Sequence, residues 1–433
     1  MTPLTFIHDL TWDDLPSHVQ THAKTLLLDL ICIAAGGLST KMSQISRDHA
    51  AEDLTGTVPI LFDGRGASAG AAAMAAGYTI DSLDGHDGYN PAKGHVGCPL
   101  LPVLLVFGHQ GAVSGRDFLE ALVMGYEFGS RAAVAQHGTV PDYHTSGSWG
   151  AVAGAAGGAR LAGLDHETTR HALGLAEYHG PRSQMMRCID YPTMVKDGSG
   201  WGAMCAVSAV QLARRGFTGA PAITVEQAPE YWDTLGKRWL ILEQYIKPYP
   251  VCRWAQAPVE GVLALRRAHN LSSQDVAKIR VETFHESVRL ATSEPKTTEE
   301  AQYSTSFPTA VALVRGALGP DDLDGDALND PEILRLSTGL EMTESDKAND
   351  AFPDTRYARV TLDLTDGRSV TSDWMQPKWD PTAPPTADEM RDKYHALADP
   401  VLGPDRAREI AGIVAELETR PLSDLTELLF RPV

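Results

Sequence analysis

Apolar residues recur at helical spacing along most of the first 250 residues of the chain. The segment 19–37, VQTHAKTLLLDLICIAAGG, carries apolar residues around most of a helix and stops at a glycine pair, which predicts a buried helix. Further Ala-rich segments with the same period, several of them opened or ended by glycine, predict helices at 67–80, 98–112, 115–136, 147–163 and 201–215. The pattern therefore predicts a helical N-terminal half.

The pattern changes after the sequence KPYPVCRW, residues 247–254. Residues 276–284 predict a strand, and residues 357–374 alternate around Asp366-Gly367, a dipeptide suited to a tight hairpin turn. Helical spacing marks the segments 297–318 and 330–338 and returns from residue 386. This order predicts a mainly α fold, with a large all-helical domain of residues 1–255 and 386–433 and a smaller α+β lid domain of residues 256–385.

The charge of the chain restricts its partners. Its 433 residues carry 56 acidic against 37 basic side chains, a formal net charge of −19, and no run of Lys or Arg. This balance excludes a nucleic-acid partner and an anionic membrane surface, so an anionic substrate would need a local cationic pocket. The N-terminus is acidic where a signal peptide would be basic, and no apolar stretch reaches the length of a membrane span. We therefore expect a cytoplasmic protein.

Cofactor signatures are weak in this sequence. The five cysteines lie far apart without a C-x-x-C pair, which predicts free thiols and neither a zinc ribbon nor an iron–sulfur cluster. Gly64-x-Gly66 follows a short apolar run like a dinucleotide fingerprint, but the alternation of strands and helices that a doubly wound sheet needs is missing. We expect no metal, nucleotide or other cofactor.

The stretch 81–99, DSLDGHDGYNPAKGHVGCP, gathers many ionisable groups in one loop and allows three interpretations. A metal site could draw on Asp84, His86, Asp87 and His95, although their spacing defines no tetrahedral or octahedral set. A solvated loop would use its Asp and Gly residues only to make turns. The apolar helices predicted on both sides favour acid/base groups that line a pocket and acquire shifted pKa values.

Two further loops carry polar residues directly before small-residue helices. Tyr143 and His144 precede the helix predicted at 147–163, whose free N–H groups suit a carboxylate, although Ser, Thr and Gly there also suit simple helix capping. Lys196 precedes the helix predicted at 201–215 and is either a functional cation or a solvated charge.

The expected border between the domains holds three more candidates. Lys247, Tyr249 and Arg253 lie in a crossing stiffened by two prolines. Cations at this position suit the binding of an anionic ligand between domains, and a plain hinge is the alternative.

Taken together, these stretches resemble the MmgE/PrpD family, which contains 2-methylcitrate dehydratase, cis-aconitate decarboxylase and an iminodisuccinate epimerase. The resemblance covers nearly the whole chain and rests on six stretches in the family's order: AKTLLLDLICIAAGG, DSLDGHDG…GHVG…LLPVLL, HTSGSWGAVAGAAGGARLAGLD, MVKDGSGWGAM…LARRGFTG, KPYPVCRW and EPKTTEEAQYSTSFPTAVAL. It implies a metal-free homodimeric enzyme with a helical domain, an α+β lid and, between them, an active site for small di- or tricarboxylates.

The resemblance also implies the roles of particular residues. The family's active-site aspartate corresponds to Asp84, and its two histidines to His95 and His144. Its catalytic lysine corresponds to Lys196, after a gap of one residue in the alignment. The resulting site residues are, as catalytic groups, Asp84, His95, His144 and Lys196, and, as substrate-binding groups, Tyr143, Lys247, Tyr249, Arg253, Gln256 and Phe307.

Three positions depart from the family's pattern. Gly88 stands where dehydratases and decarboxylases tend to carry threonine, Gln256 where many members carry histidine, and Phe307 where a lid tyrosine is expected. These departures remove hydroxyl and imidazole proton donors. We therefore expect weak dehydration of 2-methylcitrate and weak decarboxylation of cis-aconitate.

A mechanism can be stated from the residue types. Removing a proton beside a carboxylate builds negative charge, so the site needs a base near the C–H bond and cations or N–H donors near the oxygens. His95 or His144 suits the base, and Asp84 would orient a histidine or hold a proton. Lys196, Lys247 and Arg253 suit the binding of the carboxylate oxygens, where the negative charge builds. All three are among the site residues given above.

We therefore predict a metal-free lyase of the dehydratase or decarboxylase type that acts on a small di- or tricarboxylate. An epimerase or isomerase of a dicarboxylate, such as an iminodisuccinate-like compound, is the first alternative, because reprotonation on the opposite face can follow the same proton abstraction. A non-catalytic carboxylate-binding protein is the second alternative, but it needs no pair of histidines around its pocket.

Overall fold

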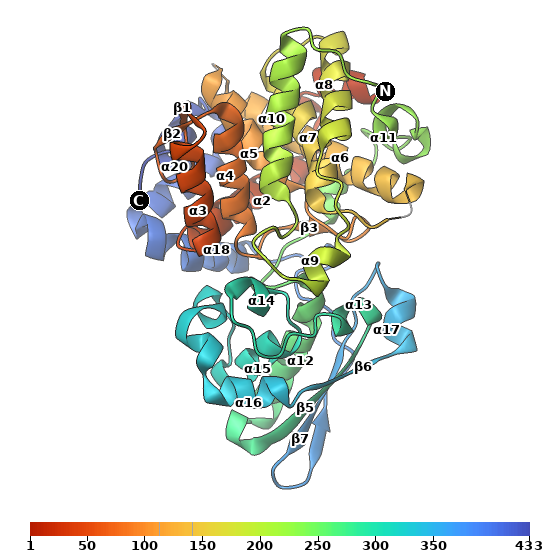
Figure 1. Cartoon of the computed structure of the whole chain (residues 1–433), viewed down its shortest axis with the longest axis vertical. Coiled ribbons are helices and arrows are strands. Elements are labelled where there is room, and N and C mark those ends of the chain that lie inside the picture. Colours follow the sequence, from red (N-terminus) through yellow and green to blue (C-terminus); the bar gives the residue numbers. More distant parts are fainter. Residues whose placement is uncertain (112, 141) are drawn as a thin grey trace.

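The computed structural model describes residues 1–111, 113–140 and 142–433. Apolar side chains form two separate clusters, one from residues 6–246 and 379–429 and the other from residues 185–189 and 251–364. Figure 1 shows the corresponding parts one above the other. We call the upper part the helical region and the lower part the α+β region. The predicted domain borders at 255/256 and 385/386 stay predictions.

The helical region consists mainly of helices, which confirms the predicted mainly α fold. They are α1 (Pro3–Asp9), α2 (Ser17–Gly37), α3 (Lys41–Glu52), α4 (Ala69–Asp81), α5 (Gly97–Gln110), α6 (Gly115–Thr139), α7 (Ser146–Leu161), α8 (His166–His179), α10 (Ser199–Arg214), α11 (Ile223–Glu226), α18 (Ala387–Leu402), α19 (Pro404–Ala415) and α20 (Ser423–Leu429). Helix α9 (Met186–Asp190) lies between α8 and α10 in the sequence, but its buried side chains belong to the apolar cluster of the α+β region. The region is not purely helical, because β1 (Thr55–Pro59) pairs with β2 (Gly66–Ala67) and β3 (Gly88–Tyr89) pairs with β4 (Gln244–Tyr245). Strands β2, β3 and β4 have two residues each, which is too few to leave a periodic signal in a sequence.

Small residues let α4 and α7 pack closely on α10. A Cβ at Gly77 of α4 would lie 2.8 Å from the Cα of Gly200, and a Cβ at Gly202 of α10 would lie 2.5 Å from the carbonyl oxygen of Gly147 of α7. Larger side chains would hold these helices apart. The close packing brings the C-terminal end of α4 together with the N-terminal ends of α7 and α10, which are flanked by the loops with the candidate residues.

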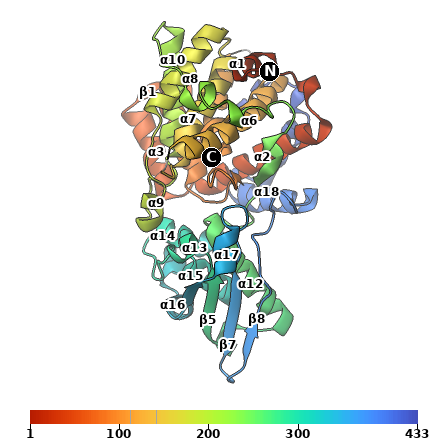
Figure 2. The same cartoon turned by 90° about the vertical axis from the view of Figure 1, so that its right-hand side faces the viewer.

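The α+β region consists of helices packed on one four-stranded sheet. Its helices are α12 (Arg253–His269), α13 (His285–Val288), α14 (Thr298–Gln302), α15 (Ser306–Arg315), α16 (Pro331–Thr338) and α17 (Asp346–Ala351). The sheet has the order β6-β5-β7-β8, with β5 (Val276–Thr283), β6 (Glu341–Glu344), β7 (Arg359–Leu364) and β8 (Ser369–Thr371). Figure 2 shows β5, β7 and β8 side by side at the end away from the helical region.

The sequence-based expectations for the α+β region are partly confirmed. The hairpin β7–β8 turns at Gly367, whose φ of 89° suits glycine, and β5 is present as predicted. The helix expected over 297–318 is divided into α14 and α15, and Tyr303 lies at the break. The parallel strand β6 was not predicted, because its residues EMTE are mostly exposed and do not alternate between apolar and polar.

The two regions are joined by chain crossings on either side of the α+β region. At the first crossing β4 pairs with β3 in the register Gly88 to Tyr245, which fixes the loop after α4 against the crossing. At the second crossing the carbonyl oxygen of Lys378 accepts a hydrogen bond of 3.0 Å from Arg253.

Within the described ranges no single helix is long and apolar enough to cross a membrane. Helices α2 and α3 together have the length and composition of a span, but they meet at an angle of 91°.

Candidate active site

A small cavity lies between the helical region and the α+β region. Its volume is about 20 Å³, which is room for about one water molecule. Both regions contribute its walls, which include three tyrosines (Tyr143, Tyr245 and Tyr303) and the charged or titratable residues Asp84, Lys93, His95, Asp197, Arg253 and Arg356. The cavity is therefore narrow and shared between the two regions, and the apolar side chains of Met185, Ile189 and Trp254 also line its wall.

Asp84 lies at this boundary in the loop after α4 and is held from three sides. Its carboxylate forms a buried ion pair with Lys247, whose Nζ also donates to the Asp84 carbonyl oxygen at 3.0 Å. Its backbone N–H donates to Oε1 of Gln302, from α14, at 2.8 Å. Burial opposes ionisation, but the charges of Lys247, His95 and Lys196 lower the pKa of Asp84 well below its usual value. Asp84 is therefore a fixed carboxylate, and Lys247 is its counter-ion.

His95 points its Nε2 atom toward two carboxyl groups. Nε2 lies 3.6 Å from Oδ2 of Asp197 and 3.8 Å from Oδ1 of Asp84. Nδ1 lies 2.5 Å from the carbonyl oxygen of Asp87, and because a carbonyl only accepts, Nδ1 carries the hydrogen and Nε2 the lone pair. Burial, followed by His86 and Lys247, lowers the pKa of His95 to about 4. At neutral pH the ring is a neutral base that faces the cavity.

Asp197 is the second carboxyl at His95 and precedes α10. Its Oδ1 accepts a hydrogen bond from Oγ of Ser146 at 3.2 Å, and its Oδ2 accepts one from the Tyr303 hydroxyl at 3.4 Å. Burial raises the pKa of Asp197 above its usual value, and the charges of Asp81 and Asp84 act in the same direction. The site thus holds one carboxyl that stays ionised and one whose pKa is raised to about 6, close enough to neutral pH to take up and release a proton, a pattern typical of acid/base catalysis.

Three cations line the cavity around these groups. Arg253, at the start of α12, donates to the Lys378 carbonyl oxygen and, at 3.3 Å, to Asp380. Arg356 donates to the Pro353 carbonyl oxygen at 2.8 Å and to the Asn90 side chain. Lys93 has its Nζ 4.4 Å from the centre of the Tyr143 ring. Because the two arginines come from the α+β region and the acid/base groups from the helical region, a bound polycarboxylate would touch both.

Two predicted catalytic residues do not line the cavity in the described structure. His144 forms an isolated bridge with Gln184 and is absent from the wall of the cavity, to which the adjacent Tyr143 contributes. Lys196 lies behind Asp84, where its Nζ donates to the Ser82 carbonyl oxygen at 3.2 Å and to Oε1 of Gln302 at 2.5 Å.

Three predicted substrate-binding residues lie in the surrounding structure. The Tyr249 hydroxyl donates to Glu260 at 2.8 Å. The Gln256 side chain donates to the carbonyl oxygens of Tyr249 and Val251, at 3.1 Å each, and so braces the first crossing. Phe307 is completely buried in the apolar cluster of the α+β region. The structure therefore brings together Asp84, His95, Tyr143 and Arg253, with Lys247 in direct contact with Asp84.

Several cavity residues were missed by the sequence analysis. Asp197 and Tyr303 lie within stretches that carry the family resemblance, and Lys93 lies within the loop 81–99, so a signal was present for all three. Tyr245 lies in β4 at the first crossing, and its place beside the cavity becomes visible only through the pairing of β3 with β4. Arg356 directly precedes the predicted hairpin at 357–374 and lies outside every stretch with candidate chemistry, so its sequence context does not indicate its place in the cavity.

Tyr245 occupies the space that a side chain at position 88 would need. A Cβ at Gly88 would lie 2.5 Å from Cζ of Tyr245, closer still to its hydroxyl oxygen, and 2.9 Å from Nδ1 of His95. The phenol of Tyr245 therefore stands where the resemblance leads one to expect a threonine.

We expect Gly88→Ala to lower the free energy of unfolding by about 1–3 kcal/mol, because the added methyl group overpacks the Tyr245 ring. Urea unfolding measures the change. Gly412→Ala is the control, since a Cβ there meets nothing within 4 Å in helix α19 and is expected to be neutral or stabilising by up to about 1 kcal/mol. Equal effects of the two substitutions would show that Tyr245 does not fill this space.

A metal site drawn from the loop 81–99 does not fit the contacts found. Asp84 is paired with Lys247, and the Nδ1 atom of His95 is bonded to a backbone carbonyl. Asp81, His86 and Cys98 do place one possible ligand atom each within 4.8 Å of one another. Burial raises the pKa of the Cys98 thiol well above its ordinary value, so the thiol is neutral unless a metal displaces its proton.

We expect that a chelator leaves the activity of the protein unchanged. The measurement is turnover after dialysis against EDTA, compared with turnover after mock dialysis. Loss of activity on chelation, restored by one divalent ion, would contradict the prediction.

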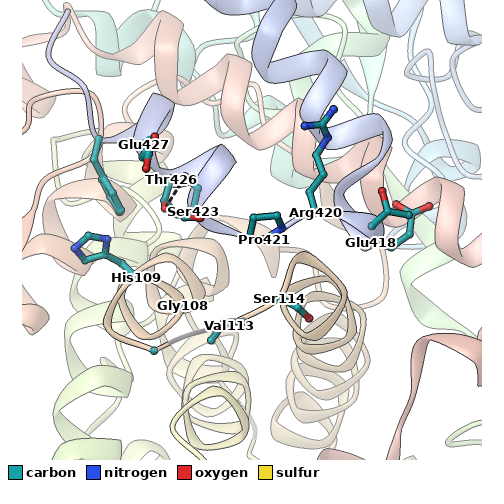
Figure 3. Close-up of a pocket in the computed structure, with 13 residues that line it drawn as sticks. Gly108, His109, Val113, Ser114, Glu418, Arg420, Pro421, Ser423, Thr426 and Glu427 are labelled. Carbon is teal, nitrogen blue, oxygen red and sulfur yellow. Dashed lines mark hydrogen bonds between the residues drawn. The ribbon is translucent and has the colours of Figure 1, made fainter.

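A larger pocket lies elsewhere, between the end of α5, the start of α6 and α20 (Figure 3). Its volume is about 780 Å³ and its wall includes His109, Glu418, Arg420 and Glu427. Arg420 is paired with Glu416 and Asp424, and none of the predicted site residues borders this pocket. The convergence of acid, base and cations therefore favours the small cavity as the functional site.

Comparison with known proteins gives matches along nearly the whole chain. A family model of the MmgE/PrpD N-terminal domain matches residues 4–236, and one of the MmgE/PrpD C-terminal domain matches residues 249–419. The chain is 27% identical to the cis-aconitate decarboxylase-like protein oryM of Aspergillus oryzae, over 98% of this chain and 95% of that protein. It is 24% identical to cis-aconitate decarboxylase of Homo sapiens, over 99% and 94% of the two chains. A shorter match, also 24% identical, covers 47% of this chain and 43% of mitochondrial 2-methylcitrate dehydratase of Yarrowia lipolytica.

Proposed function

This chain belongs to the MmgE/PrpD family, and from that premise we propose that it is a lyase of the dehydratase or decarboxylase type that acts on a small di- or tricarboxylate. The names of its relatives, cis-aconitate decarboxylase and 2-methylcitrate dehydratase, support this class of reaction and substrate. The observation that carries the proposal is the pair formed by the neutral His95 ring and Asp197 in a cavity lined by Arg253 and Arg356.

The proposed mechanism assigns each side of the cavity one task. The arginines bind substrate carboxylates and stabilise the negative charge that develops on them as the neighbouring C–H or C–C bond is broken. In a dehydration, Nε2 of His95 takes the C–H proton, and the electron pair of that bond forms the double bond as hydroxide leaves with a proton from an acid. In a decarboxylation, carbon dioxide leaves instead, and the electron pair of the broken bond takes a proton from an acid.

Proton donors are present despite the departures at Gly88, Gln256 and Phe307. Asp197, Tyr245 and Tyr303 all line the cavity. The expectation of weak activity on cis-aconitate and 2-methylcitrate rested on the lack of such donors, so both compounds belong in the first test.

The volume of the cavity sets a condition on substrate binding. A space of about 20 Å³ holds no di- or tricarboxylate. We therefore propose that the α+β region moves away from the helical region to admit the substrate and closes on it before the reaction.

The test is incubation of the purified protein with a panel of small polycarboxylic acids in deuterated buffer, followed by mass spectrometry. The panel includes cis-aconitate, 2-methylcitrate, citrate and malate. A lyase gives a product that lacks water or carbon dioxide, and a decarboxylation product also gains one deuterium. A deuterated compound of unchanged composition would instead indicate the epimerase, and binding without any change in mass would contradict the enzyme proposal.

The remaining expectations of the sequence analysis stay predictions. They are the homodimer, the cytoplasmic location and the independence from metals.

A further inference from the structure

Asp197 is the cavity carboxyl whose role the resemblance to the family does not assign. It is only 2% exposed, and its Oδ2 lies 3.6 Å from Nε2 of His95, the ring nitrogen that carries the lone pair. The Tyr303 hydroxyl donates to the same oxygen, and the Ser146 hydroxyl donates to the other one. These contacts fix the position of the carboxyl, and Oδ2 is the atom directed toward His95.

The contrast with Asp84 separates the two carboxyls. Asp84 is in direct contact with the ammonium group of Lys247, which keeps it ionised. Asp197 has hydroxyl groups and the neutral His95 ring around it, and among the described residues no lysine or arginine nitrogen lies within 4.0 Å of its oxygens. A buried carboxyl without a cation is the one that can hold and release a proton near neutral pH.

We propose that Asp197 is the catalytic acid of the site and works opposite His95, the base. In a dehydration its proton goes to the leaving hydroxyl as the C–O bond breaks, and in a decarboxylation it goes to the carbon that receives the electron pair. Asp197 is then ionised, and solvent returns its proton when the two regions separate. This inference rests on the proposed lyase function and names the group that completes it.

Whether the Asp197 carboxyl is protonated depends on the charged and titratable groups around it. They come from several elements: Asp81 from α4, Asp84 and His95 from the loop that follows α4, Lys247 from the first crossing, Cys188 from α9 and Tyr303 from the break between α14 and α15. Burial raises the pKa of the Cys188 thiol and of the Tyr303 phenol well above their ordinary values, so both remain neutral. Burial and the ionised Asp84 thus oppose ionisation of Asp197, whereas Lys247, already paired with Asp84, favours it. Burial also raises the pKa of Asp81, which opposes ionisation of Asp197 only when Asp81 itself is charged.

The first test detects the proton on the Asp197 carboxyl directly and needs no substrate turnover. The difference infrared spectrum between the parent and Asp197→Asn is recorded as a function of pH, and Asp84→Asn is treated in the same way. We expect a protonated carboxyl band from Asp197 at about pH 5, where an ordinary aspartate is mostly ionised, and no such band from Asp84. Absence of the Asp197 band would overturn this inference and leave the proposed lyase function standing.

The second test uses the compound from the polycarboxylate panel that the parent converts. Asp197→Asn should lower kcat at least about a hundredfold with little change in KM. In the parent, kcat/KM should fall at high pH as Asp197 loses its proton, and this fall should disappear in the residual activity of Asp197→Asn. Asp233→Asn, at an exposed position, is the control for a neutralised aspartate and should behave as the parent does.

The outcomes separate the two proposals. Near-parental kcat and an unchanged pH profile in Asp197→Asn would overturn the role of Asp197 while the enzyme remains a lyase. If the parent converts no panel compound, the proposed function fails and the catalytic role of Asp197 fails with it, whereas the infrared band still reports where the proton is.

Discussion

Replacing Lys247 with methionine is expected to lower the free energy of unfolding by about 3–5 kcal/mol, because it leaves the carboxylate of Asp84 buried without its counter-ion. Both partners are almost inaccessible to solvent, with side-chain exposures of 0% for Lys247 and 2% for Asp84. Methionine keeps most of the volume of the lysine stem, so the change tests the charge rather than the packing. Urea unfolding monitored by circular dichroism measures the loss.

Two further variants make this result specific. Lys278→Met removes one partner of an exposed pair with Glu341 and should lose no more than about 1 kcal/mol. The double variant Asp84→Asn/Lys247→Met removes both charges and should be more stable than Lys247→Met alone. If Lys247→Met loses no more stability than Lys278→Met, the ion pair at Asp84 does not support the fold.

The second large effect is expected for His95→Gln, which should reduce turnover of the substrate at least about a hundredfold, the usual scale for a positioned acid/base group. Glutamine keeps a polar group of similar length but has no basic nitrogen. Since the pKa of His95 is lowered to about 4, the parent should hold its activity down to mildly acidic pH and lose it as the ring is protonated. Steady-state rates between pH 4 and pH 9 measure both effects.

Two other histidines serve as comparisons. His179→Gln changes an exposed ring at the end of α8 and should leave the rate unchanged. His144→Gln tests the other histidine that the resemblance assigns to the site, and its placement beside Gln184 leads us to expect a smaller loss than in His95→Gln. A loss in His144→Gln as large as that in His95→Gln would show that His144 takes part in the reaction.

Much of the fold was visible in the sequence because long helices repeat their signal many times. Helix α2 carries apolar residues over 21 positions, and the hairpin β7–β8 has Asp366-Gly367 at its turn. The strands β3 and β4 have two residues each, so no period can be recognised. Their pairing depends on contacts between residues more than 150 positions apart, which local patterns do not encode.

The sequence indicated part of the site, because local motifs mark the loops that carry its residues. Motifs indicate which loops carry chemistry, and they pointed to the loop 81–99 and to the stretch around Lys196, both of which contribute residues to the cavity wall. They do not indicate which way each side chain points. Within MVKDGSG, Lys196 is turned toward Gln302 behind Asp84, and the adjacent Asp197 reaches the cavity. Such choices depend on the packing of α4 and α7 on α10, which only the three-dimensional structure describes.

The amide of Gln302 links the position of the α+β region to the assembly of the site. It extends from α14 to the backbone of Asp84 and to Lys196, and a separation wide enough for a tricarboxylate would break both contacts. A short acid that reaches only one wall of the cavity would occupy an open site in which Gln302 does not yet hold Asp84 and Lys196 in place. An acid with carboxylates at both ends would draw Arg253 and Arg356 toward His95 and restore the contacts. We therefore expect the protein to select its substrate by length before any bond is broken, so that short monocarboxylates are rejected even where they carry the reactive group.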